Sequence, residues 1–330
     1  MKKILTLLFL LTNLVFAGVN ENLFIAIEKN DISGVKLALK NGAKLNMNDK
    51  HGQSPLLLSL KDSKLDIVKY LVEKGANIRE KNQNMSMVQW AKFLSQEEVE
   101  NYLIKKGGAI PVNDKNYSIF LEIIKNNNEE VKKMVEQNSK LIELEDELKR
   151  TPLFYSVLMD NYEITKFLLE NGASIDVQDI YKENPFYVAI KNNNPLICKL
   201  LIENGAGIEE ECSFEEKPLG IALYYNSYNV IKLLLENNVK IYDNYLNIGA
   251  INNSKESVEL LMDEMKARKI NINLTSALFD AVLCNSKEVI KLLFENGADK
   301  QSKDFSGQGL LEFATNSQTR KFLLDMGVKW

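Results

Sequence analysis

A repeat with a period of about 33 residues limits what this chain can fold into more than any other feature of its sequence. Several units contain a proline and a later glycine at a constant spacing, as in Pro152 with Gly172 and Pro185 with Gly205. Periods of this length are typical of solenoids, in which each unit packs only against its neighbours. Ten units account for residues from about 18 to 330, which leaves no room for a second domain. They align on Asn22, Pro55, Val88, Ser118, Pro152, Pro185, Pro218, Tyr245, Ala277 and Leu310.

Each unit predicts two helices joined by a polar turn. The first helix begins at the aligned position, where proline is suitable because its missing N–H would have no intrahelical partner there. The second helix carries apolar residues such as Ile67 and Leu71 at helical spacing, and these form one buried face. A glycine ends it in seven of the ten units, because helices commonly end with a residue in the left-handed region. Asn138 and Asn238 are expected to replace that glycine, and Met265 is the exception.

With these elements the sequence resembles the ankyrin-repeat family. The family's Thr-Pro-Leu, Val-x-x-Leu-Leu and Gly-Ala motifs correspond to Thr151–Leu153, Ile164–Leu169 and Gly172-Ala173. The resemblance covers roughly residues 20–330 and implies an all-α ankyrin-repeat solenoid of about ten stacked helix-turn-helix units with short fingers or loops. It also implies a recognition scaffold without catalytic activity. The histidine that often follows the family's Thr-Pro-Leu is absent, and its places hold Leu57, Phe154, Tyr187, Gly220 and Phe279.

Two parts of the array depart from the period. Pro218 and Tyr245 are closer in sequence than any other consecutive aligned positions, so a stretch as long as a finger is missing between the seventh and eighth units. The second helix of the eighth unit is then expected to continue by one turn through residues 263–269. Drift in a tolerant scaffold and a bend that shapes a binding surface both explain these changes. The last unit, about residues 306–330, has a shortened turn and is predicted to be a C-terminal cap.

Residues 1–17 have the pattern of a secretory signal peptide. Lys2 and Lys3 precede an apolar run over residues 4–16, and Val15-Phe16-Ala17 has the form of a cleavage site. The run is shorter than the ~20 residues that span a bilayer, and a buried or amphipathic helix is the alternative. Cleavage near Ala17 leaves residues 18–330 as the array and predicts a periplasmic or secreted protein of bacterial type. No later segment predicts a membrane span.

Charge and residue content argue against several classes of function. The formal charge is −4, and loss of the two leader lysines leaves 39 basic and 45 acidic residues, or −6, which disfavours nucleic-acid binding. His51 is the only histidine, which argues against histidine-based catalysis and against metal sites built from several histidines. No phosphate loop or nucleophile elbow occurs, and we expect no catalytic, cofactor-binding or metal-binding residues. Cys198, Cys212 and Cys284 match no disulfide framework, so no structural disulfide is expected.

Tyrosines concentrated in the fifth to seventh units are the main candidates for a binding site. Tyrosine offers a large contact area with a polar tip and is enriched at interface hot spots. Packing between adjacent turns is the alternative role. The predicted partner-binding residues are Tyr155, Tyr162, Tyr187, Tyr224, Tyr225 and Tyr228.

The sequence therefore predicts a scaffold that binds another protein through its concave face and fingers, outside the cytoplasm. The acidic finger residues 143–147 and 209–211 are expected to be solvated and would favour a partner with a basic patch. An immunity or inhibitor protein directed against a toxic enzyme is an alternative, and a secreted effector that acts on a host is another. An enzyme is not expected, because no acid pair lies on a common apolar face.

Overall fold

A computed structural model describes residues 18–60, 64–82, 85–109, 118–210 and 216–329 of the chain. It divides into two compact units, with the boundary between Lys125 and Asn126. The predicted signal peptide and Cys212 lie outside the described residues. The first unit contains a helix over residues 18–28, α2 (Ile32–Lys40), α3 (Pro55–Ser59), α4 (Leu65–Glu73), β1 (Lys81–Asn82), β2 (Met85–Ser86), α5 (Met87–Phe93), α6 (Glu97–Lys105) and α7 (Ser118–Ile124).

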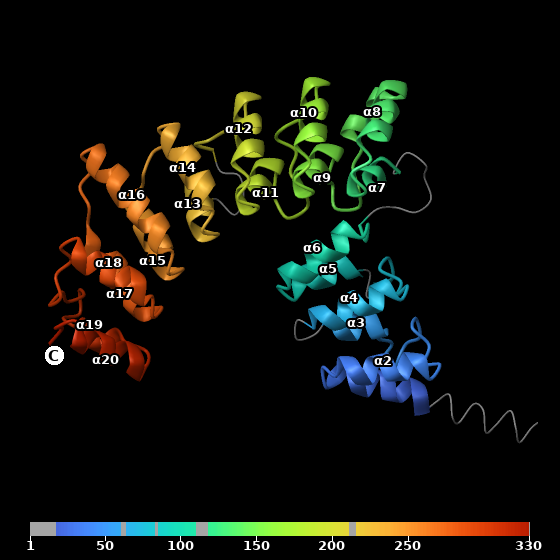
Figure 1. Cartoon of the computed structure of the whole chain (residues 1–330), viewed down its shortest axis with the longest axis horizontal. Coiled ribbons are helices and arrows are strands. Elements are labelled where there is room, and N and C mark those ends of the chain that lie inside the picture. The colour runs from blue at the N-terminus through green and yellow to red at the C-terminus, as the bar shows by residue number, and fades with distance from the viewer. Residues whose placement is uncertain (1–17, 61–63, 83–84, 110–117, 211–215, 330) are drawn as a thin grey trace, which may run out of the picture. The chain divides into compact units, whose positions relative to one another are not determined.

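The second unit is a stack of helix pairs in two layers (Figure 1). The first helices of successive repeats, α9, α11, α13, α15, α17 and α19, pack side by side, and the second helices α8, α10, α12, α14, α16 and α18 form the other layer. This arrangement confirms the predicted solenoid of helix-turn-helix units. The elements are α8 (Asn128–Gln137), the 3₁₀ helix η3 (Ser139–Glu143), α9 (Pro152–Leu158), α10 (Tyr162–Glu170), α11 (Pro185–Lys191), α12 (Pro195–Glu203), α13 (Pro218–Tyr224), α14 (Tyr228–Glu236), α15 (Tyr245–Ile251), α16 (Lys255–Ala267), α17 (Leu274–Leu283), α18 (Lys287–Glu295), α19 (Leu310–Phe313) and α20 (Ser317–Asp325).

The first helices begin where the repeat predicts. Pro152 and Pro185 occupy the first helical positions of α9 and α11. The residue before each proline caps the helix, since Thr151 Oγ1 accepts from Phe154 N–H at 3.4 Å and Asn184 Oδ1 accepts from Tyr187 N–H at 2.8 Å. In the ninth repeat α17 begins at Leu274, three residues before the aligned position. In α9 and α11 the proline and the capping residue before it together determine where the first helix of the repeat starts.

The second helices end as predicted wherever glycine is present. All seven of these glycines have φ between 78° and 101°, in the left-handed region, and so does Asn238 with φ of 58°. The prediction for Asn138 is wrong, because its φ is −149° and the chain there enters η3, with the Asn138 side chain accepting from Lys140 N–H. An asparagine tolerates the left-handed region but does not require it.

Asparagines also form the turns between the two helices of a repeat. Side-chain oxygens in these turns link neighbouring repeats, as Asn126 Oδ1 accepts from Asn161 Nδ2 at 3.2 Å and Asn226 Oδ1 accepts from Ser257 Oγ at 2.7 Å. The polar turns are therefore part of the contacts that hold the stack together. Six turn asparagines have φ between 51° and 61°: Asn30, Asn126, Asn193, Asn226, Asn253 and Asn285.

The irregular eighth repeat has a structural explanation. Helix α16 is 13 residues long and passes through Met265, which is only 2% exposed, so the left-handed residue is Lys269 instead. The extra turn positions Arg268, whose Nη1 donates to Val239 O at 2.7 Å and whose Nη2 donates to Leu235 O at 2.8 Å. A cation thereby satisfies carbonyl groups at the end of α14. The predicted extension of α16 is confirmed, and it compensates for the missing finger.

Candidate functional site

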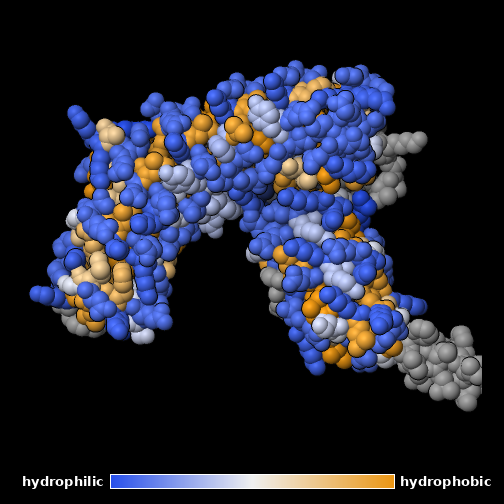
Figure 2. Space-filling model, viewed as in Figure 1, coloured by the Kyte–Doolittle hydropathy of each residue, from blue (hydrophilic) through white to orange (hydrophobic). Residues whose placement is uncertain are grey.

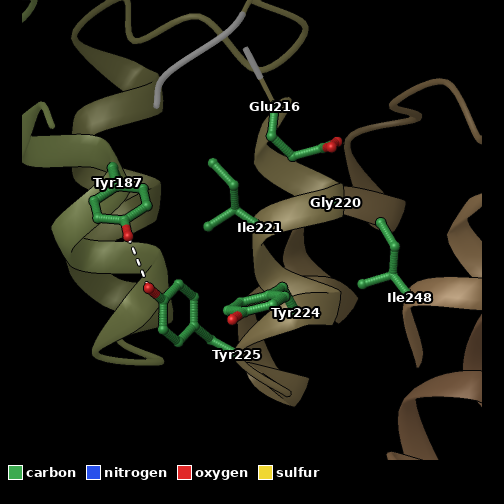
Figure 3. A pocket seen from close by; sticks show the side chains of 7 residues that line it. All are labelled: Tyr187, Glu216, Gly220, Ile221, Tyr224, Tyr225 and Ile248. Carbon is green, nitrogen blue, oxygen red and sulfur yellow. Dashed lines mark hydrogen bonds between the residues drawn. The ribbon is translucent and has the colours of Figure 1, made fainter. Parts of the chain in front are cut away.

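The predicted tyrosines do not form one cluster. Tyr162, on α10, and Tyr228, the first residue of α14, are 45% and 40% exposed. Tyr187, Tyr224 and Tyr225 lie together at a groove between α11, α13 and α15 (Figure 3). Tyr155 is fully buried. Three of the six residues are thus brought to one site.

The groove has a volume of about 450 Å³ and a mostly apolar lining. In Figure 3, Ile221 of α13 lies between Tyr187 and Gly220, and Ile248 of α15 faces Gly220 from the other side. Tyr224 and Tyr225 lie at one end of the groove, and Glu216 lies at the other. Pockets that are largely apolar with a few polar groups are typical binding sites.

Hydrogen bonding and ring packing hold the tyrosines in place. The hydroxyl oxygens of Tyr187 and Tyr225 are 2.8 Å apart, and the two rings meet edge to face with centroids 6.1 Å apart. Tyr224 packs edge to face on Tyr225 at 5.1 Å. Tyr187 is only 3% exposed, whereas Tyr224 is 61% exposed. Tyr187 and Tyr225 therefore support a tyrosine that is open to a partner.

Gly220 shapes the other end of the groove. A Cβ added at this position would overlap the Glu216 carboxylate, so only glycine lets that carboxylate lie against the first turn of α13. Burial raises the pKa of the nearby Tyr245 hydroxyl, and the negative charges of Glu216 and Glu209 raise it further. Tyr245 therefore stays neutral, and the acidic charge at this end of the groove comes from glutamates.

Exposed apolar residues continue the site beyond the groove. Tyr224, Ile251 and Leu283 are the last residues of α13, α15 and α17, and they are 61%, 47% and 47% exposed. These three helices pack side by side, so the residues form an apolar row across three repeats. Figure 2 shows that hydrophilic residues cover most of the viewed face of the molecule, with hydrophobic residues in small patches. Contiguous exposed apolar residues surrounded by polar ones are a feature of interaction surfaces.

The groove contains residues that were not predicted from the sequence. Ile221 is one of them, and its position three and four residues before the predicted Tyr224 and Tyr225, on the same helix face, was the available signal. Glu216 and Ile248 had no such signal. Ile248 reaches the groove from α15 of the next repeat, and Glu216 lies there because Gly220 has no side chain.

Contrary to the prediction, Tyr155 is not available to a partner. Its hydroxyl donates to Asp146 Oδ2 at 2.9 Å, inside a buried polar cluster. Asp146 also accepts the N–H groups of Leu148 and Arg150, each at 2.8 Å, and is 6% exposed, so the expectation of a solvated acidic finger is wrong for this residue. Arg150 forms a buried ion pair with Asp179 at 2.9 Å. This cluster holds together the two fingers that precede α9 and α11, and it does not form a binding surface.

Burial sets the protonation of the acids in this cluster. Desolvation raises the pKa of Asp146 from 3.8 to about 6, although the N–H and charge of Arg150 and the Tyr155 hydroxyl lower it in part. Burial likewise raises the pKa of Asp179, and the adjacent Arg150 opposes that rise. An aspartate at the corresponding position of another finger, Asp304, is accessible to solvent. It accepts the N–H groups of Ser306 and Gln308 at 2.9 and 2.7 Å. Burial therefore raises the pKa of the finger aspartate at Asp146 and Asp179, whereas the pKa of the solvent-accessible Asp304 is lowered.

The remaining features of the described residues concern metal binding, membrane spans, the histidine and the cysteines. Within them, no group of three or more His, Cys, Asp or Glu side chains is placed to hold a metal ion. None of the described helices combines the length and apolar character needed to cross a bilayer. His51 is exposed in the finger between α2 and α3, and its N–H donates to Asp49 Oδ1 at 2.8 Å. Cys198 is buried and Cys284 is exposed.

Comparisons with known proteins agree with this architecture. The profile of the family described as ankyrin repeats (3 copies) matches residues 23–116, 108–179 and 174–245. The crystal structure of the Bcl-3 ankyrin repeat domain, a member of the IkappaB family, is similar with a TM-score of 0.51 and 19% identity, over 65% of this chain and 100% of that chain. The human ASB11 ankyrin repeat domain is similar with a TM-score of 0.54 and 20% identity, over 62% and 96%. No curated protein sequence matches this chain significantly. At these identities the structural likeness shows the fold alone.

Proposed function

This chain belongs to the ankyrin-repeat family, and from that premise we propose that it is a non-catalytic scaffold that binds another protein outside the cytoplasm. Ankyrin repeats are typically protein-binding modules. The observation that carries the proposal is the open Tyr224 beside the hydrogen-bonded pair of Tyr187 and Tyr225. A tyrosine held in place before binding loses little conformational freedom when a partner docks.

The proposed interface consists of the groove and the apolar row that follows it. The row carries the contact surface from Tyr224 to Ile251 and Leu283. Stable protein interfaces bury about 800 Å² on each partner, and several adjacent repeats can supply that area. Docking onto the stacked inner helices requires no rearrangement of the repeats, so we propose rigid-body association.

The interface is tested by capture of the partner with matched variants. The chain is tagged at its C-terminus and isolated from the envelope fraction of the cells that make it, and proteins that accompany it stoichiometrically are identified. We expect a partner that is lost with Tyr224→Ala and weakened with Leu283→Ser, since both substitutions remove exposed contact area. Tyr162→Ala is the control, because Tyr162 is also an exposed tyrosine but lies on α10 outside the groove. A partner that tolerates Tyr224→Ala contradicts the proposed surface, and the absence of any partner contradicts the scaffold.

The location outside the cytoplasm is a separate part of the proposal. It is supported by Lys2 and Lys3, the apolar run that follows them and the small residue Ala17. The mass of the purified protein and its distribution between cell fractions test it. A mature N-terminus at Gly18 in the periplasm supports export, whereas full-length protein in the cytoplasm refutes it. Inhibition of a partner enzyme would identify an immunity protein, and recovery from the medium would identify an effector.

A further inference from the structure

Glu216 is the acidic side chain that lines the groove together with the tyrosines. Its carboxylate accepts the N–H of Lys217 at 3.2 Å, and it forms no ion pair with any residue in the part of the chain that the structure describes. The nearby Glu209 likewise accepts a backbone N–H, from Lys240. A partly buried carboxylate at the end of an apolar groove favours a cation as its complement.

The charged groups at the two ends of the groove indicate where a cation would bind. At the tyrosine end, Lys191 Nζ already lies 5.6 Å from the centre of the Tyr225 ring, so a second cation there would meet a like charge. At the other end, Glu216 forms no ion pair among the described residues, and the nearest lysines, Lys217 and Lys240, place their ammonium groups over the Tyr242 ring. Of the two ends of the groove, the one at Glu216 therefore offers a carboxylate to a positive group.

The walls between the two ends are aliphatic. Ile221 and Ile248 lie on either side of Gly220, whose missing side chain leaves room for the Glu216 carboxylate (Figure 3). Long basic side chains bury their methylene stems on such walls and keep the charged group at a polar end. Arginine fits better than lysine, because its planar guanidinium pairs with a carboxylate through two parallel hydrogen bonds and packs well beside aromatic rings.

We propose that the groove of α11, α13 and α15 binds an arginine side chain of the partner protein, with its stem between Ile221 and Ile248 and its guanidinium on Glu216. The proposal rests on the scaffold function and specifies the chemistry of the segment that the scaffold holds. Tyr224 then contacts the backbone or the neighbouring residues of that segment, on the side away from Glu216. Gly220 is essential to this geometry, since any side chain there would displace the carboxylate.

The test uses a library of short random peptides displayed on phage and selected against the purified full chain. Peptides that no longer bind Tyr224→Ala are groove ligands, and we expect arginine to be enriched at one position in them. A selected peptide is then synthesised with arginine or the neutral citrulline at that position, and its affinity is measured by calorimetry. We expect citrulline to weaken binding to the native protein about tenfold, and Glu216→Gln to weaken the arginine peptide by the same factor.

A matched control and a double-mutant cycle isolate the contact. Glu236→Gln makes the same charge change at the exposed end of α14 and should leave the affinity unchanged. In Glu216→Gln, exchange of arginine for citrulline should have no further effect, because the two changes remove one interaction. Tyr224-dependent peptides that lack an enriched arginine, or that bind Glu216→Gln with unchanged affinity, overturn the arginine proposal and leave the scaffold function standing. If no Tyr224-dependent peptide is selected, both the arginine site and the groove as the binding surface are refuted.

Discussion

Replacement of Asp146 by asparagine should stabilise the second unit at pH 7.5 and have little effect at pH 4. Asp146 is 6% exposed, and burial raises its pKa from 3.8 to about 6. Asparagine has the same shape and removes the charge. Its oxygen can still accept the two N–H groups of Leu148 and Arg150, and its amide group can donate to the Tyr155 hydroxyl in place of the bond that Tyr155 now donates.

The sign and size of the effect follow from the two pKa values. Between pH 3.8 and about 6 the folded protein holds a proton on Asp146 that the unfolded chain has released, so the free energy of unfolding falls as the pH rises through this range. Below 3.8 both states are protonated and the contribution is complete, and above about 6 it is lost. A difference of about two pH units corresponds to about 3 kcal/mol, which is the stabilisation expected for Asp146→Asn at neutral pH.

Amide hydrogen exchange of peptides that cover residues 146–158 measures this local stability directly, since a repeat array need not unfold in a single step. Asp304→Asn is the matched control, because the same finger motif is exposed there. Desolvation raises the pKa of Asp304, but hydrogen bonds from Ser306, Gln308 and Gly307 together outweigh it and lower the pKa, so this variant should lose protection at neutral pH. If Asp146→Asn exchanges faster than the native protein at pH 7.5, Arg150 holds Asp146 ionised and the reasoning is refuted.

Three further substitutions test the contacts that hold the repeats together, each by urea unfolding followed by circular dichroism. Arg150→Met should cost about 3–5 kcal/mol, because it leaves Asp179 buried without its cation, and a loss below about 1 kcal/mol would contradict a buried ion pair. Arg268→Gln should cost about 1.5–3 kcal/mol, because it removes charged hydrogen bonds to the end of α14, and an unchanged midpoint would show that solvent replaces them. Gly205→Ala should cost about 1–2 kcal/mol, because φ is 101° there, and a neutral result would mean that the turn relaxes.

Most of the fold could be predicted from the sequence because the information is local and repeated. A proline at the first helical position and a glycine at a fixed distance after it each act within one turn of the chain. The misses have two causes. Arg268 acts on the end of α14 in the preceding repeat, so its contact leaves no pattern within its own repeat. Asn138 adopts an extended conformation before η3, because an asparagine tolerates the left-handed region without requiring it.

The candidate site shows the same division, because position in the repeat decides what a tyrosine does. Tyr155 lies three residues after its aligned proline and reaches the buried Asp146, whereas Tyr224 lies six residues after Pro218 and ends α13 in solvent. Ile251 and Leu283 also end their helices in solvent, although neither is aromatic. Selection by residue type therefore included a core residue and omitted two surface residues. Aligned positions at the ends of the inner helices, where a large apolar residue has no core to enter, are the better guide to the binding surface of such an array.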